Sequence, residues 1–176
     1  VSLTPAVFHL SERVNRVLRT YGKRPIVPRG PRLAPLLSGV LRGIEQALGA
    51  TQHRAAVFTG TGSSAMAAVL GSCLAPKERL LVVRNGAYGD RLLAFAKQLR
   101  QPVVDLSAPY GDRPDLDKLM TTLARDEVDT VAMVYGATST CTLNPVAEVG
   151  ALCKRYGKKL FVDGVRAAFI EPLDLD

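Results

Sequence analysis

The sequence is poor in the residues that build metal centres, disulfide frameworks and hydrolytic triads. It has no tryptophan, two histidines and three cysteines in 176 residues. The cysteines, at positions 73, 141 and 153, are odd in number and form no CxxC pair, which argues against a disulfide framework and a zinc site. We expect each of them to be a small, buried apolar side chain in a reducing cytoplasm. His9 and His53 belong to no visible Ser/His/Asp set.

Long apolar runs are also missing. No stretch approaches the ~20 residues that a membrane span needs, and residues 1–10 lack the basic start and apolar core of a signal peptide. Hydrophobic residues make up 47% of the chain and charged residues 22%, the balance of an ordinary globular domain. The length suits one domain with a sizeable core.

Acidic residues are scarce at the start of the chain. Residues 1–54 carry nine Lys or Arg and only two acids, whereas the rest of the chain is neutral. A single aromatic residue, Tyr21, lies among these cations, whereas a surface that stacks nucleic-acid bases would require several. The pattern therefore argues against a nucleic-acid partner and favours a solvated face or a surface for an acidic partner.

Beyond residue 54, short apolar runs alternate with amphipathic segments. Strands are expected over residues 55–58, 80–83, 103–106, 130–135 and 160–163, and helices over 36–48, 63–73, 90–99, 114–124 and 145–156. This alternation predicts an α/β fold with a mainly parallel sheet flanked by helices, in which ligands bind at the carboxyl ends of the strands. We expect a basic N-terminal segment with helices over 1–54, followed by a partial α/β domain over 55–176.

Two of the loops after these strands have the chemistry of a phosphate site and a stacking site. The Gly60–Ser64 loop opens a helix with glycines and hydroxyls, so its backbone N–H groups can face an anion. Gly-Ser turns open many helices, however, and neither a P-loop lysine nor GxGxxG is present. Tyr88 follows the next strand, where it can stack on a planar ligand or simply occupy a turn.

Two further loops offer oxygen atoms. Residues 137–141, after the strand ending at Tyr135, contain hydroxyls that can contact a ligand or make local turn bonds. Asp163 ends the last apolar strand, and a carboxylate there needs a donor, such as a protonated ring nitrogen or a salt-bridge partner.

In this order the four loops resemble the class V, fold-type-I pyridoxal-phosphate (PLP) aminotransferases, and most closely the 2-aminoethylphosphonate:pyruvate transaminases. The resemblance rests on the segments TGTGSSAMAAVLGS, VVRNGAYGDR, VDTVAMVYGATSTCTLNPVAEVGALCKRYGKKLFVDGV and EPLDLD. It covers most of this chain but only about the first half of a family member, so it implies the large, PLP-binding domain without the small C-terminal one.

The resemblance implies a role for each matching residue. Thr61, Gly62 and Ser63 would hold the PLP phosphate, and Tyr88 would stack on the pyridine ring. Thr138 or Thr140 would approach the ring oxygen. Asp163 would pair with the ring nitrogen, which makes the ring an electron sink for a substrate carbanion.

Several positions depart from the family pattern. Ala137 stands where the family has Glu, Cys141 where it has Gly, and Arg166 brings a cation close to the expected cofactor. The Schiff-base lysine would follow the next strand, beyond Asp176, so no catalytic residue is expected within these 176 residues.

Two hypotheses about function follow. In the first, the chain is part of a PLP-dependent transaminase that acts on an amino donor and a 2-oxo acid, inactive alone, and completed as a homodimer or by a second chain. In the second, it is a non-catalytic truncated homologue that serves as a partner or scaffold subunit.

Overall fold

The computed structural model describes residues 11–23, 27, 30–173 and 175. The chain divides into two compact units, residues 1–44 and 45–176. Residues 1–10 and the segment at Pro28 and Arg29 lie outside the described residues. No helix among the described residues is long and apolar enough to cross a bilayer.

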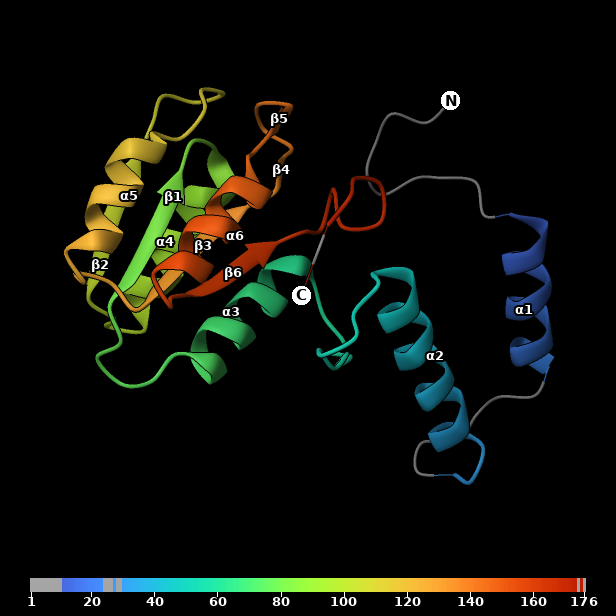
Figure 1. The fold of residues 1–176 in the computed structure, drawn as a ribbon. Helices are drawn as coiled ribbons and strands as arrows, with labels where there is room; N and C mark the ends of the chain where they lie inside the picture. Colours follow the sequence, from blue (N-terminus) through green and yellow to red (C-terminus); the bar gives the residue numbers. More distant parts are fainter. Residues whose placement is uncertain (1–10, 24–26, 28–29, 174, 176) are drawn as a thin grey trace. The chain divides into compact units, whose positions relative to one another are not determined.

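The first unit contains α1 (Glu12–Lys23) and most of α2 (Leu33–Ala47), drawn in blue in Figure 1. The α1 helix begins after Ser11, whose Oγ accepts a hydrogen bond from the backbone N of Val14 at 3.3 Å. Ser11 therefore acts as the N-cap of α1. Beyond α2 the chain turns at Gly49, whose φ of +63° suits a residue without a Cβ.

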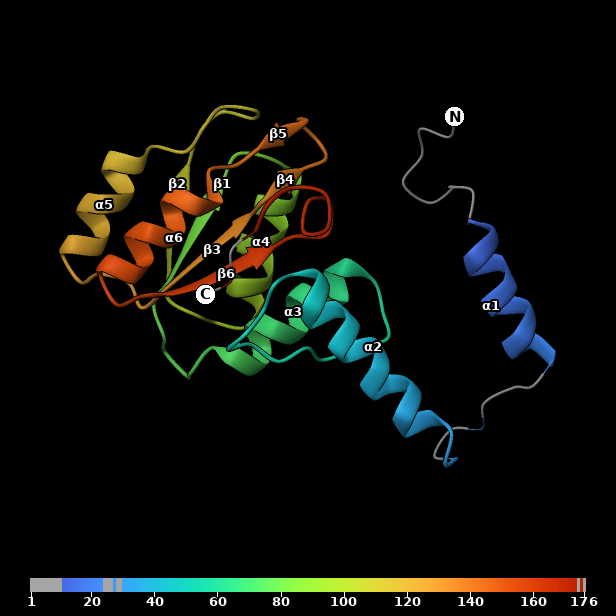
Figure 2. The ribbon, with the colours of Figure 1, turned by 45° about the vertical axis from the view of Figure 1, so that its right-hand side comes forward.

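The second unit is built on a four-stranded parallel sheet in the order β2-β1-β3-β6 (Figures 1 and 2). Its strands are β1 (Leu80–Arg84), β2 (Val103–Ser107), β3 (Thr130–Val134) and β6 (Lys159–Asp163). Its helices are α3 (Gly62–Cys73), α4 (Ala87–Gln98), α5 (Leu116–Ala124) and α6 (Val146–Arg155). The predicted α/β fold with a parallel sheet is confirmed.

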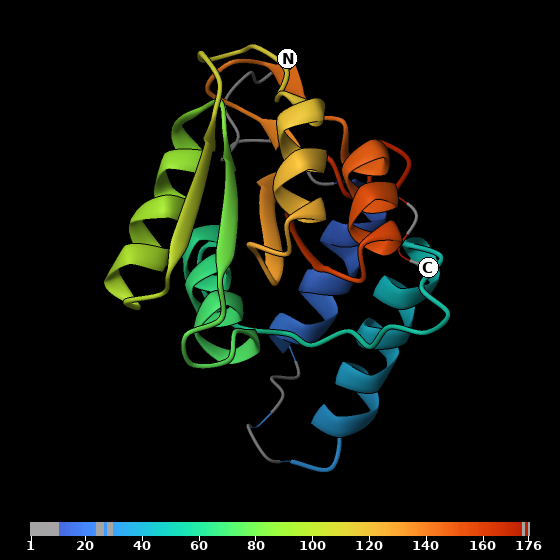
Figure 3. The same ribbon diagram turned by 60° about the vertical axis from the view of Figure 1, so that its left-hand side comes forward.

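Alternate side chains of the two central strands enter two apolar layers. Leu80 and Val82 pack with α3 and α4, whereas Leu81 and Val83 pack with α5 and α6. The side chains in both layers are almost fully buried, which explains why the sequences of β1 and β3 are continuous apolar runs. Figure 3 shows α4 and α5 on opposite sides of the sheet.

The connections reverse direction between β1 and β3. From β1 the chain crosses through α4 to β2 on one side, and from β3 it crosses through α6 to β6 on the other. In an open parallel sheet, such a reversal leaves a crevice at the carboxyl ends of the two strands, where ligands bind. We call the edge where the strands finish the carboxyl end of the sheet and the opposite edge the amino end.

The structure differs from the expected elements in two places. Residues 55–58 form no strand, and Val57 and Phe58 are exposed. An extended apolar segment becomes a strand only where a neighbouring strand offers free N–H and C=O groups, and no such neighbour lies here among the described residues. A small hairpin, β4 (Gly136–Ala137) and β5 (Thr142–Leu143), follows β3 and was not expected.

Candidate functional site

The Gly60–Ser64 loop forms an open helix start. Thr61 caps α3, because its Oγ1 accepts a hydrogen bond from the backbone N of Ser64 at 3.1 Å. The backbone N–H groups of Gly62 and Ser63 make no hydrogen bond with any residue that the structure describes. Two free N–H groups and two hydroxyls at a helix N-terminus have the donor set that a phosphate group needs.

Arg91 connects this loop to Tyr88. Its Nη1 donates to Ser63 Oγ at 2.5 Å, and its guanidinium carbon lies 5.0 Å from the centroid of the Tyr88 ring. The sequence analysis did not single out Arg91. The available signal was its spacing of three residues from Tyr88, which places both side chains on one face of α4.

Asp163 lies beside the same loop. It is 7% exposed, and its Oδ1 accepts a hydrogen bond from the backbone N of Val165 at 3.1 Å. A Cβ built on Gly62 would lie 3.1 Å from Val165 Cγ2, so the turn after β6 packs directly against the start of α3. Among the described residues, no cation pairs with the Asp163 carboxylate, which leaves it able to accept a bond from a protonated ligand nitrogen.

Thr138 and Thr140 face different neighbours. Thr138 is exposed and lines a pocket with Arg166, whereas Thr140 packs near Gly86 and Gly111. The Oγ1 atom of Thr140 is buried and has no hydrogen-bond partner among the described residues. An orphaned buried hydroxyl is costly, so Thr140 is the better placed of the two to meet a ligand atom beside the end of β1.

A buried amide pair joins the carboxyl ends of β1 and β3. Asn85 Nδ2 donates to Asn144 Oδ1 at 2.7 Å, and Asn144 Nδ2 donates to Asn85 Oδ1 at 3.2 Å. Asn144 also donates to the carbonyl of Val134 at 2.8 Å. Asn144 stands just before α6, and its side chain joins the ends of the two strands.

The predicted site residues therefore converge at the carboxyl end of the sheet. Hydrogen bonds and close packing run from Asp163 through Val165 to Gly62, and from Ser63 through Arg91 to Tyr88. Gly86 brings the end of β1 to the 137–141 turn, since a Cβ there would lie 3.0 Å from Ser139 Oγ.

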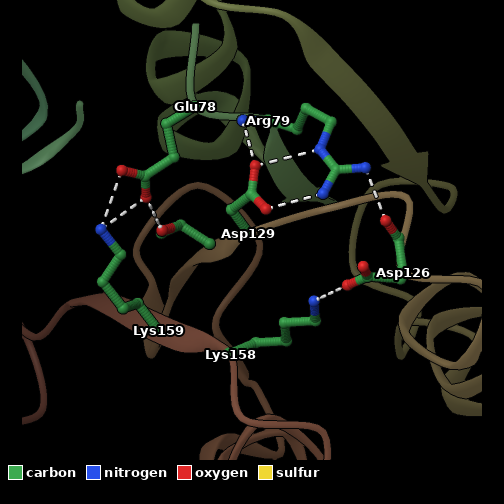
Figure 4. A network of polar contacts seen from close by, with 7 residues as sticks. Glu78, Arg79, Asp126, Asp129, Lys158 and Lys159 are labelled. Atoms are coloured by element: carbon green, nitrogen blue, oxygen red, sulfur yellow. Dashed lines mark hydrogen bonds and ion pairs between the residues drawn. The ribbon is translucent and has the colours of Figure 1, made fainter. Parts of the chain in front are cut away.

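Lys158 and Lys159 lie at the opposite, amino end. Lys159 pairs with Glu78 at 2.7 Å, and Lys158 pairs with Asp126 (Figure 4). Arg79 donates to Asp129 from both its backbone and its guanidinium. These lysines are engaged in ion pairs away from the converging loops. Among the described residues, no cluster of three or more His, Cys, Asp or Glu could hold a metal ion.

The sequence matches the family model for aminotransferase class-V over residues 24–176. The chain belongs to the class V aminotransferase family. It is 37% identical over 143 residues to the 2-aminoethylphosphonate–pyruvate transaminases of Salmonella schwarzengrund and Salmonella typhimurium, an alignment that covers 78% of this chain and 39% of each relative.

Solved structures of aminotransferases share the fold. The alanine–glyoxylate aminotransferase of a Nostoc species aligns with a TM-score of 0.71 at 29% identity, over 88% of this chain and 41% of that one. The phosphoserine aminotransferase of Cytophaga hutchinsonii aligns with a TM-score of 0.79 at 14% identity, over 92% and 44%. The chain thus spans about two fifths of the length of the family members it matches.

Proposed function

We propose that this chain forms the cofactor-binding part of a PLP-dependent aminotransferase similar to 2-aminoethylphosphonate–pyruvate transaminase. The observation that carries the proposal is the convergence of an open helix start, an aromatic ring and a buried carboxylate without a cation partner at one end of a parallel sheet. Family members supply the reaction class, and these residues supply the donors and acceptors that PLP requires.

Each residue has a definite task in the proposed site. The free N–H groups of Gly62 and Ser63, with the hydroxyl of Thr61, would hold the phosphate group. Arg91 would add a positive charge beside that group through its position at Ser63. Bound PLP supplies an electron sink for a carbanion at the substrate α-carbon. Asp163 would maintain the proton on the pyridine nitrogen by accepting its hydrogen bond.

The rest of the site positions these groups. Tyr88 packs partly against the α3 and α4 core layer, so its ring is held in place to stack on a pyridine. Thr140 would direct its unpaired hydroxyl to the ring oxygen, and Thr138 remains the alternative. The glycine at position 62 permits close approach between the two loops that would enclose the cofactor.

The lysine that would anchor PLP covalently is proposed to lie outside these 176 residues. We infer that the chain alone binds PLP reversibly and does not transaminate. A non-catalytic partner or scaffold role remains the second candidate, favoured by Ala137 and Cys141 at positions where the family has Glu and Gly. Both candidates predict no transaminase activity from the chain alone, and PLP affinity distinguishes them.

The test is equilibrium dialysis of the 176-residue chain against PLP, with an Asp163→Ala variant. Loss of the bond to the protonated ring removes about 1–3 kcal/mol, so the dissociation constant should rise about fivefold to 150-fold. Asp126→Ala is the matched control, since it removes a carboxylate at the amino end of the sheet. Equal PLP affinity in the wild type and Asp163→Ala would contradict the proposed site.

A homodimer, or a second chain that completes the fold, is proposed as the partner. Val165, Phe169 and Ile170 are large apolar side chains, 66–79% exposed, in the turn that follows β6. Exposed apolar groups gathered beside a site favour an interface. Light scattering that shows a stable monomer at micromolar concentration would count against a homodimer.

A further inference from the structure

A pocket of about 200 Å³ lies beside the proposed cofactor site and shares only Thr138, the alternative contact for the ring oxygen, with it. One wall is the β4–β5 hairpin, including Gly136, Ala137 and Thr138, and the other is the turn after β6, including Arg166 and Glu171. Arg166 is the only cation among the residues that line it. The pocket therefore presents one guanidinium next to the loops that would hold PLP.

The charge of Arg166 is not neutralised by the described part of the chain. Its guanidinium makes no ion pair or hydrogen bond with any described residue. Arg84, also at the carboxyl end of the sheet, is instead held between Asp90 and Asp105 at 3.0 and 2.8 Å. A guanidinium that pairs with no carboxylate and lies beside a pocket is suited to an external anion.

The backbone around Arg166 is fixed at both ends of its turn. Tyr135 donates from its hydroxyl to the carbonyl of Pro172 at 2.8 Å, and Val165 donates to Asp163 at 3.1 Å. A Cβ on Gly136 would lie 3.3 Å from the Cβ of Arg166, so the hairpin packs against the base of that side chain. Because its base is held in this way, the guanidinium can bind an anion at a smaller entropic cost.

We propose that this pocket binds a small oxoanion, the carboxylate or phosphonate group of a substrate, through Arg166 and the hydroxyl of Thr138. A guanidinium matches such a group with two parallel N–H donors. Thr138 adds a hydroxyl that makes no hydrogen bond with a described residue. The role in transamination rests on the proposed function, whereas binding of the anion itself does not require PLP.

Glu171 allows the opposite charge effect on anion binding to be tested. Its carboxylate lines the same pocket but makes no ion pair with Arg166. A negative charge there opposes anion binding through Coulomb repulsion. Removing it should therefore strengthen binding, whereas removing Arg166 should weaken it.

The test is a titration of the PLP-free chain with methylphosphonate and, separately, with acetate, followed by NMR shifts of the backbone amides of Ala137, Thr138 and Ala167. We expect saturable shifts with at least one anion. Arg166→Gln should raise the dissociation constant at least tenfold, and Glu171→Gln should lower it. Arg125→Gln is the charge-matched control, since Arg125 is an exposed residue after α5, and it should change the constant less than twofold.

Each outcome of this titration either supports or overturns part of the proposed anion site. The absence of saturable shifts with either anion, or unchanged affinity in Arg166→Gln, overturns the site. Thr138→Val, which retains the charge of Arg166, should weaken binding about threefold, and no change would remove Thr138 from the proposal. Preference for methylphosphonate assigns the pocket to a phosphonate group, and preference for acetate assigns it to a carboxylate. Failure of PLP to bind in dialysis, with anion binding intact, would overturn the proposed function alone.

Discussion

The two ends of the sheet differ in how their cationic side chains are paired. At the amino end, Arg79, Lys158 and Lys159 each pair with a carboxylate (Figure 4). At the carboxyl end, Arg84 is paired with two carboxylates, but Arg91 bonds only a hydroxyl and a ring, and Arg166 bonds no described residue. The amino end therefore pairs each of these cations, whereas the carboxyl end leaves Arg91 and Arg166 without a carboxylate and available to a ligand.

This contrast separates stability from binding within one sheet. Glu78 illustrates the stabilising end, with a side chain only 6% exposed. Burial alone would raise the pKa of Glu78, but hydrogen bonds from Lys159, Thr130 and the backbone of Ala75 outweigh that effect and lower it. Substitutions at the amino end should therefore change unfolding, and those at the carboxyl end should change ligand affinity.

The largest expected effect is a loss of stability caused by a substitution at the carboxyl end, which makes it an exception to this division between stability and binding. Asn144→Ala should lower the free energy of unfolding by about 3 kcal/mol, because it leaves the Asn85 amide and the Val134 carbonyl buried without their partner. The measurement is urea denaturation of both proteins. Gln98→Ala, at the exposed end of α4, is the control and should stay within ~0.5 kcal/mol. A similar loss in both variants would show that the amide pair has no special role.

The second largest effect concerns pH, because acid should weaken the ion pairs at the amino end of the sheet and so lower the free energy of unfolding. Hydrogen bonds from Arg79 lower the pKa of Asp129, and the hydrogen bond from Lys158 lowers that of Asp126. A carboxyl group with a folded pKa below its unfolded value of about 4 stabilises the fold above that value. This stability is complete above about pH 5 and is lost as the pH falls through the folded pKa values.

Asp129→Asn isolates one of these groups. The variant should show a shallower fall in unfolding free energy between pH 5 and pH 3, measured by urea denaturation at each pH. Asp112→Asn serves as the control, because the Asp112 carboxylate makes no ion pair with a described residue. An unchanged slope in Asp129→Asn would mean that the pKa of Asp129 does not differ between the folded and the unfolded chain.

A smaller effect is expected from Arg91 at the carboxyl end. Arg91→Gln should weaken PLP binding about fivefold, or ~1 kcal/mol, because it removes a positive charge beside the proposed phosphate site. Urea denaturation should show little change in stability. Arg100→Gln, after the other end of α4, is a charge-matched control. Loss of stability without loss of affinity would assign Arg91 to the fold.

The smallest effect tests the turn beside the pocket. Cys141 has a φ of +55°, a conformation that glycine adopts without strain. Cys141→Gly should therefore raise the free energy of unfolding by up to about 1 kcal/mol. Cys73→Gly, within α3, should lower it by about the same amount. If Cys141→Gly instead lowered the free energy of unfolding as Cys73→Gly does, the backbone of the turn would not be strained.

Sequence periodicity predicted the parallel sheet because β1 and β3 are buried on both faces and their apolar runs are continuous. It also predicted that the loops converge, since parallel strands finish at one edge. The strand over residues 55–58 was wrong, because pairing depends on a neighbour that a local pattern cannot supply. The expected burial of the cysteines was right only for Cys153, since Cys73 and Cys141 are exposed. Arg91 was missed because its role depends on which side chains share a face of α4 and meet the distant residue Ser63.

The strand order has a consequence for folding kinetics. Leu80 of β1 pairs with Val103 of β2 and with Thr130 of β3, and the nearby contact between Arg79 and Asp129 joins residues 50 positions apart. Long-range parallel pairings of this kind form slowly, since the intervening loop must close first. During synthesis β1 emerges early but has one side open until β3 follows. Its apolar surface is then the part of the nascent sheet that most needs protection from aggregation.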